Sequence, residues 1–180
     1  ENNGFEVTTL RHDVETHGRH ATVAFTSDWQ ADAARRDFTI NALYCGLDGS
    51  IFDPLNGIDD IFNRHVRFVG EPAARILEDF LRILRFFRFF AQYGEGAPDE
   101  AGLAACKQHR AGLRQLSRER VGQEMGKLLM ARRASDGIDF MNEAGVSEAL
   151  FGERLDAAMV ARVAAIDEAN DLVPDLPMRL

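Results

Sequence analysis

The spacing of apolar residues divides this chain of 180 residues into two parts. Up to residue 69 the apolar runs are short and rich in β-formers, and 5–10 (FEVTTL) and 21–26 (ATVAFT) are strand candidates. The polar stretch 12–20 between them is expected to be a loop. From residue 71 onward the apolar spacing is helical. The pattern therefore predicts a mixed α/β part followed by an all-helical part.

Turn dipeptides and capping signals place the remaining elements. Within the first part we expect a helical start over 28–41, a hairpin over 43–52 around Asp48-Gly49, a turn at Asn56-Gly57 and a short strand over 66–69. In the second part we expect a largely buried helix over 72–90, a break at 94–98, and helices over 99–108, 118–130, 134–143 and 154–169.

The expected helix 72–90 carries a charged stripe on an otherwise apolar surface. Arg75, Glu78, Asp79 and Arg82 are spaced by three and four residues, so they share one face. A buried stripe needs partners, and the i,i+4 pairs Arg75–Asp79 and Glu78–Arg82 would supply some of them. Arg85 and Arg88 would then form a like-charge row with Arg82. Either internal pairing accounts for the stripe, or an anion such as a triphosphate or RNA lies beside it.

Asp79 and Arg82 together match a feature that cytosine and adenine share. Both bases present an amino donor beside a ring-nitrogen acceptor, which a carboxylate and a guanidinium can pair with. Uracil and guanine present a carbonyl and a ring N–H at those places and would leave both side chains unpaired, at about 1–3 kcal/mol each. One Asp/Arg pair can thus admit C and A and reject U and G.

A second candidate site is the segment 35–41, RRDFTIN. Two arginines beside Asp37, Thr39 and Asn41 suit phosphates and a ribose with its 2′-hydroxyl. The same Arg-Arg-Asp run is also common on solvated helix ends, so alone it is compatible with a plain surface role.

Composition changes this picture only slightly. The net charge of −8 argues against a broad electrostatic interaction with nucleic acid. Of 21 basic residues only Lys107 and Lys127 are lysines; this favours directional phosphate or base contacts, although a GC-rich genome produces the same bias.

No apolar run approaches the ~20 residues of a membrane span. Cys45 and Cys106 form no metal or disulfide pattern, which favours a reducing cytoplasm.

Five motifs in this order resemble those of the bacterial-type (class II) tRNA nucleotidyltransferases and poly(A) polymerases. They are RRDFTINAL (35–43), DPLNGIDD (53–60), NRHVRFVG (63–70), EDFLRILR (78–85) and SRERVGQEMGKLL (117–129). The resemblance implies an α+β chain: the C-terminal part of a polymerase-β-like nucleotidyltransferase head (1–69), an all-helical neck with a base-selecting motif (70–145) and the start of a helical body (146–180).

The resemblance also implies a reaction, the addition of C, C and A from CTP and ATP to the 3′ end of tRNA with Mg²⁺ and without a template. It implies that Arg35, Arg36, Asp37 and Asn41 bind the sugar and phosphates, that Asp79 and Arg82 read the base, that Glu78 orients Arg82, and that Arg85 approaches the phosphates or supports the site. In the last motif, Glu119, Arg120 and Glu124 are expected to support the neck.

The chain departs from the family in one respect. It contains neither the glycine-rich GGxVRD-like segment nor the Asp-x-Asp pair that would hold Mg²⁺. Glu6 stands where such enzymes carry a third carboxylate, and is otherwise a solvent-facing strand residue; Arg11 would close that strand and face the phosphates. We therefore expect this chain to be inactive alone. The alternatives to a CCA-adding enzyme are a poly(A) polymerase of the same family and a non-catalytic nucleotide- or RNA-binding module.

Overall fold

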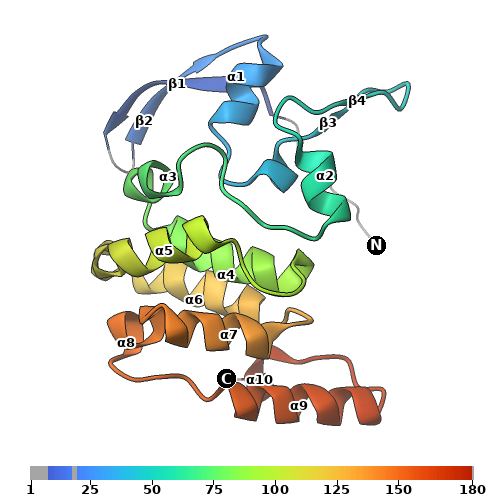
Figure 1. Ribbon diagram of the computed structural model, residues 1–180, viewed down its shortest axis with the longest axis vertical. Helices are drawn as coiled ribbons and strands as arrows, with labels where there is room; N and C mark the ends of the chain where they lie inside the picture. The colour runs from blue at the N-terminus through green and yellow to red at the C-terminus, as the bar shows by residue number, and fades with distance from the viewer. Residues whose placement is uncertain (1–7, 18–19, 180) are drawn as a thin grey trace.

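A computed structural model describes residues 8–17 and 20–179 of the chain. Two hairpins and two short helices form one end of the molecule, and the remaining helices are stacked beneath them (Figure 1). This confirms the α+β arrangement. The first end contains β1 (Arg11–His17), β2 (His20–Phe25), α1 (Trp29–Ala34), the 3₁₀ turn η1 (Thr39–Asn41), β3 (Tyr44–Cys45), β4 (Ile51–Phe52) and α2 (Gly57–Phe62).

The stacked helices follow from residue 72. They are α3 (Pro72–Glu78), α4 (Leu81–Tyr93), α5 (Glu100–His109), the 3₁₀ helix η2 (Arg110–Gln115), α6 (Arg118–Leu129), α7 (Ala134–Glu143), α8 (Val146–Phe151), α9 (Ala157–Ala169) and α10 (Leu176–Arg179). The helices expected over 99–108, 118–130 and 134–143 are confirmed as α5, α6 and α7. The sequence reading missed α8, which begins directly after Gly145 because this glycine adopts a positive φ of 67°.

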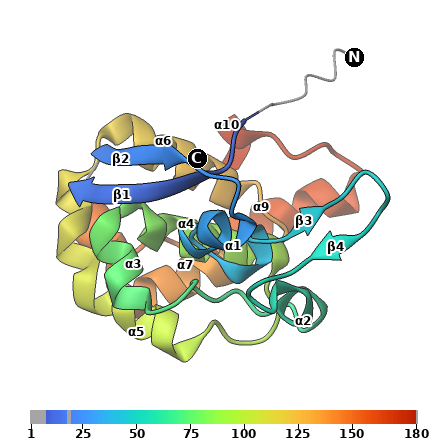
Figure 2. The same ribbon diagram turned by 90° about the horizontal axis from the view of Figure 1, so that it is seen from above.

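Viewed from above, the two hairpins lie on opposite sides of α1 (Figure 2). The hairpin expected over 43–52 is present, with Gly49 at φ 83° in its turn. The loop expected over 12–20 is wrong, because β1 pairs antiparallel with β2 through a bulge between Asp13 and Glu15. Backbone pairing needs no apolar alternation, so a polar strand gives little hydrophobic signal. Residues 66–69 form only an isolated bridge, between Phe68 and Phe38.

The long helix expected over 72–90 is also wrong, because it breaks at Asp79. Asp79 has an extended backbone (φ −155°, ψ 110°), and its Oδ1 accepts a hydrogen bond of 3.1 Å from the N–H of Leu81 in the first turn of α4. Apolar spacing continues on both sides of the break, so periodicity does not reveal it. Asp79 and Arg82 therefore do not lie on one helix face; Asp79 lies in the turn that precedes α4.

A cluster of phenylalanines joins the two ends of the molecule. The ring of Phe38, which directly precedes η1, lies 4.9 Å from Phe68 and 5.0 Å from Phe89 of α4, and Phe68 stacks on Phe86 at 5.4 Å. All four side chains are buried. Burying each stabilises the fold by about 1.5–3 kcal/mol, so this cluster fixes segment 35–41 over α4.

The turn between α3 and α4 is sensitive to overpacking from η2. A Cβ added at Gly112 would come within 2.2 Å of the Phe80 ring, whereas one added at Gly122, inside α6, would meet nothing within 4 Å. We expect Gly112→Ala to lower the free energy of unfolding by about 1–3 kcal/mol. Gly122→Ala, the matched control, should be neutral or stabilising by up to about 1 kcal/mol. Urea unfolding of both variants measures this; equal stabilities would contradict the packing described here.

Candidate nucleotide-binding site

The structure brings segment 35–41 against the helices that carry the second candidate motif. Arg75 of α3 donates from Nη2 to the carbonyl oxygens of Arg35 and Arg36, the latter at 2.6 Å. The two candidate motifs, about 40 residues apart in sequence, therefore meet at one place. We call this place the junction site. It comprises Asp32, Arg35, Arg36, Asp37, Asn41, Arg75, Glu78, Asp79, Arg82, Arg85 and Arg120.

Asp37 is the buried carboxylate at the centre of this contact. Its Oδ2 accepts from Nε of Arg85 at 2.5 Å and its Oδ1 accepts from Nδ2 of Asn41 at 2.9 Å. Burial by itself would raise the pKa of Asp37, but the Arg85 charge and these hydrogen bonds outweigh it and hold the pKa below its usual value. Asp37 is thus an ionised acceptor that ties the segment to α4.

Arg35 and Arg36 share a carboxylate that the sequence reading missed. Asp32 of α1 is 1% exposed and accepts from Nε of Arg35 at 3.0 Å and from Nε and Nη2 of Arg36 at 3.1 and 2.9 Å. The backbone N–H of Arg11 and the hydroxyl of Tyr44 also donate to it, at 3.0 and 2.8 Å. The spacing of three and four residues between Asp32 and the arginines was the available signal.

These donors control the ionisation of Asp32. Burial would raise the pKa of its carboxyl, yet the hydrogen bonds from Arg11, Tyr44, Arg36 and Arg35 together hold the pKa well below its usual value. Asp32 is therefore charged at any pH near neutrality.

The pair proposed to read a base is held by two separate sets of partners. Glu78 accepts from Arg82 through Oε2 and from Nη1 of Arg75 through Oε1, the latter at 2.8 Å, and Arg82 also donates to the Arg75 carbonyl at 2.7 Å. The expected Glu78–Arg82 contact is present. The expected Arg75–Asp79 pair is not; Asp79 instead accepts from Nη2 of Arg120 on α6, at 2.6 Å.

The remaining arginines of α4 have partners inside the chain. Nε of Arg88 donates to Glu124 at 2.6 Å, and Nη1 of Arg85 lies 3.9 Å from the other oxygen of Glu124. Together with the Arg85–Asp37 pair, these contacts remove the need for an external anion beside Arg85 and Arg88. Pairing inside the chain therefore accounts for the positive charges of these two residues.

The described residues do not form a metal site. In the ranges 8–17 and 20–179, no three His, Cys, Asp or Glu side chains gather closely enough to hold an ion. Glu6 lies outside these ranges. Arg11 opens strand β1 instead of closing a preceding strand, and its Nη2 donates to Thr8 at 2.9 Å.

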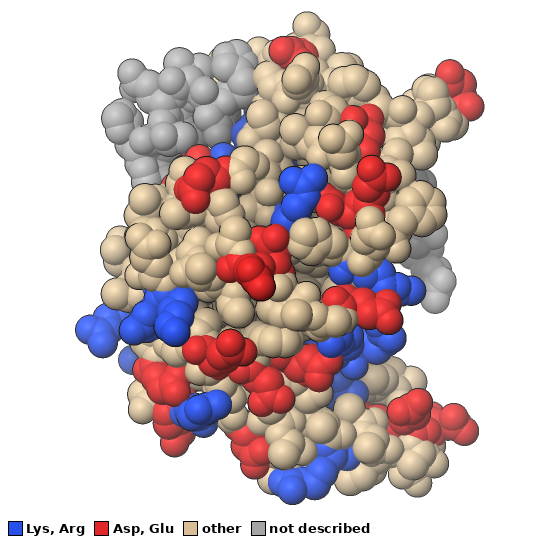
Figure 3. Space-filling model, viewed as in Figure 1, with Lys and Arg blue, Asp and Glu red and all other residues tan. Residues whose placement is uncertain are grey.

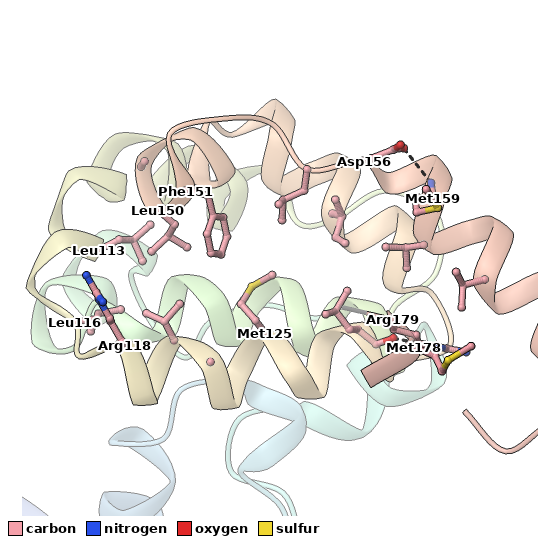
Figure 4. Close-up of a pocket in the computed structure, with 18 of the residues that line it drawn as sticks. Leu113, Leu116, Arg118, Met125, Leu150, Phe151, Asp156, Met159, Met178 and Arg179 are labelled. Atoms are coloured by element: carbon pink, nitrogen blue, oxygen red, sulfur yellow. Dashed lines mark hydrogen bonds between the residues drawn. The ribbon is translucent and has the colours of Figure 1, made fainter. Parts of the chain in front are cut away.

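A large cavity lies elsewhere. A volume of about 790 Å³ between η2, α6, α8, α9 and α10 is lined mostly by apolar side chains, among them Leu113, Met125, Phe151 and Met159 (Figure 4). Asp156 at its edge is occupied as the N-cap of α9. None of the predicted site residues lines it. Size alone would favour this cavity, but the convergent charged groups favour the junction site.

The visible surface offers no broad basic area. On the face seen in Figure 3, acidic and basic side chains are interspersed over the described residues. Over the same described ranges, no helix is long and apolar enough to cross a bilayer. On that face, contacts with a polyanion would therefore rely on individual arginines.

Comparison with known proteins gives the same family throughout. Residues 1–67 match the family described as "Poly A polymerase head domain", and residues 97–159 match "Probable RNA and SrmB- binding site of polymerase A". The chain is 47% identical over 148 residues to the mitochondrial CCA tRNA nucleotidyltransferase 1 of Danio rerio, covering 80% of this chain and 34% of that protein. It is 36% identical to a CCA-adding enzyme of Geobacillus thermodenitrificans, covering 92% and 41%.

A solved structure agrees in fold. The crystal structure of the Bacillus stearothermophilus CCA-adding enzyme in complex with CTP superposes with a TM-score of 0.74 at 34% identity, covering 88% of this chain and 38% of that one. The chain thus spans about a third to two fifths of these relatives. On motif order, fold and identity, the chain belongs to the family of CCA-adding tRNA nucleotidyltransferases and poly(A) polymerases.

Proposed function

We propose that the protein carrying this chain adds C, C and A to the 3′ end of tRNA, using CTP and ATP. The observation that carries the proposal is the junction site, where the segment suited to sugar and phosphate meets the residues suited to the base edge. The relatives' names, CCA tRNA nucleotidyltransferase and CCA-adding enzyme, support it. So does the CTP bound in the B. stearothermophilus structure. We also propose the division into head (1–69), neck (70–145) and start of the body (146–180).

Base choice would depend on Asp79 and Arg82. Asp79 accepts from the amino group of cytosine or adenine, and Arg82 donates to the adjacent ring nitrogen. Arg120 fixes the orientation of the Asp79 side chain, and Glu78 fixes that of Arg82. Because both side chains are already oriented, less conformational entropy is lost when the base binds. Because a carboxylate oxygen has two lone pairs, Asp79 can keep Arg120 and still accept from the base.

Sugar and phosphates would lie along segment 35–41. Arg35 and Arg36 supply positive charge, while Asp37 and Asn41 supply an acceptor and an amide near a ribose hydroxyl. The Arg85–Asp37 pair would hold this segment at a fixed distance from the base-reading residues.

We also propose that the reaction uses Mg²⁺ and that the protein acts in the cytoplasm. A nucleotidyltransferase uses the ion to neutralise charge on the transferring phosphate. The described residues do not fit such an ion, so its ligands would lie outside them, with Glu6 a candidate. The free cysteines Cys45 and Cys106 are compatible with a reducing compartment.

A poly(A) polymerase is the second candidate, because the matching family descriptions name a poly A polymerase head domain and a binding site of polymerase A. The test is incorporation of labelled CTP and ATP into a tRNA that lacks CCA, with the protein at the full length that its gene encodes. We expect CTP to be used first and ATP once. Repeated ATP addition without CTP would favour the polymerase, and no incorporation would favour a binding module.

The same assay applies to the 180-residue chain by itself. Because it contains no Asp-x-Asp pair, we expect no CTP incorporation above a no-protein control, even with Mg²⁺ and excess tRNA. Clear incorporation would mean that the metal ligands are misassigned.

Variants of the base-reading pair should change nucleotide choice. Arg82→Ala should lower kcat/KM for CTP and ATP together. Asp79→Ala should weaken discrimination against UTP and GTP by about 1–3 kcal/mol, or roughly 5- to 150-fold, because the acceptor that penalises their carbonyls is gone.

Asp136→Ala is the matched control, since it removes the Asp136–Arg133 pair of 2.6 Å at the start of α7. It should leave nucleotide selectivity as it is. If Asp79→Ala melts near the wild-type temperature and discriminates equally well, the base-reading role is excluded.

The sugar can be tested with a deoxynucleotide. If Asp37 and Asn41 contact the 2′-hydroxyl, dCTP should have a kcat/KM about tenfold or more below that of CTP, as expected for losing a hydrogen bond to a charged group. Equal kcat/KM for the two nucleotides would contradict the ribose contact.

A further inference from the structure

Asp32 accepts hydrogen bonds from four residues. Side-chain donors from Arg35, Arg36 and Tyr44 and a backbone donor from Arg11 converge on one carboxylate. Two of these donors are guanidiniums, so the cluster carries one negative and two positive charges. A cluster with excess positive charge, in which the side chains of Arg35 and Arg36 remain 30% and 38% exposed, suits an anion next to it.

The two arginines are used differently. Arg36 donates from Nε and Nη2 to Asp32 and from Nη1 to the carbonyl of Asn41 at 3.1 Å, so each of its three nitrogens already donates to a partner inside the chain. Arg35 donates only from Nε to Asp32. Within the described part of the chain, its two terminal nitrogens have no hydrogen-bond partner. Those nitrogens form the bidentate edge that matches a phosphate.

The position of Arg35 agrees with such a role. Its backbone carbonyl is held by Arg75, whose Nη1 contacts Glu78, and Glu78 in turn pairs with Arg82. Arg35 is thus connected through a single guanidinium and a single carboxylate to the residue proposed to read the base. A nucleotide carries its base at one end and its phosphates at the other, which suits a base-reading residue and a phosphate-binding residue on connected segments.

We propose that Asp32 is a positioning residue for the triphosphate of the incoming nucleotide. It binds Nε of Arg35 and so directs the two terminal nitrogens of that guanidinium toward the phosphates, without touching the nucleotide itself. The inference rests on the proposed function and deepens it, since it separates the phosphate-binding Arg35 from Arg36, which fixes the segment.

The experiment compares CMP with CTP, because only the phosphates beyond the first differ. Dissociation constants of both are measured by titration calorimetry on the full-length protein and on Asp32→Asn, which has nearly the same shape but no charge. The gain in affinity from CMP to CTP should fall about tenfold or more in the variant, while the affinity for CMP changes little. Equal losses for CMP and CTP would show a merely structural role and overturn the proposal.

Asp60→Asn provides the matched control. Asp60 is also buried and binds an arginine, Arg67, at 2.8 Å, and accepts from Thr39 at 2.5 Å. This variant should lower the melting temperature and keep the wild-type gain from CMP to CTP. A comparable drop in that gain would mean that any lost buried carboxylate has this effect, which contradicts a specific role for Asp32.

Arg35→Gln keeps the proposal testable if Asp32→Asn does not fold. It should reduce the gain from CMP to CTP by a similar factor, and the double variant should lose no more than either single one. An unchanged gain in Arg35→Gln overturns the proposal. If the wild-type protein binds neither nucleotide, it is the proposed function that fails, and this inference fails with it.

Discussion

A buried carboxylate, Asp37 near η1, takes its guanidinium partner from Arg85 of α4 and so helps to hold the two ends of this molecule together. Among the stacked helices, the half-buried Asp79 before α4 is paired in the same way with Arg120 of α6. Removing one partner of a buried pair costs about 3–5 kcal/mol, because the remaining charge is left in a poorly solvated place. The Asp37–Arg85 pair therefore favours one fixed placement of segment 35–41 on α4.

The apolar core explains why those pairs meet. The rings of Phe38, Phe68, Phe86 and Phe89 pack across the same boundary and bring segment 35–41 down onto α4. Non-directional burial supplies most of the free energy, and the charged pairs then select one register. The break at Asp79 also belongs to this arrangement, since a continuous helix would turn its carboxylate away from both Leu81 and Arg120.

Local signals predicted the local features. The Asp48-Gly49 hairpin, the helices α5 to α7 and the Glu78–Arg82 pair depend on neighbours within a few residues, and all were expected from the sequence. Strand β1 and the break between α3 and α4 were not, because they depend on pairing with β2 and on packing against η2 and α6.

The candidate site shows the same contrast between features that local sequence predicts and contacts between distant residues. The motif residues could be chosen from the sequence, but their partners could not. Arg120 reaches Asp79 across 41 residues, and Arg75 reaches Arg35 across 40. Asp32 was the exception that spacing could have revealed, at three and four residues from its arginines. In the sequence the Arg-Arg-Asp run instead points to Asp37, which directly follows the two arginines.

We propose that the junction site receives a nucleotide with its base against Asp79 and Arg82. A crystal structure of the full-length protein with CTP tests it most directly. We expect the cytosine amino nitrogen and ring N3 to lie about 2.7–3.2 Å from the Asp79 carboxylate and the Arg82 guanidinium, respectively. A cytosine edge that faces solvent or another element, with Asp79 and Arg82 contacting only Arg120 and Glu78, would contradict this placement of the base.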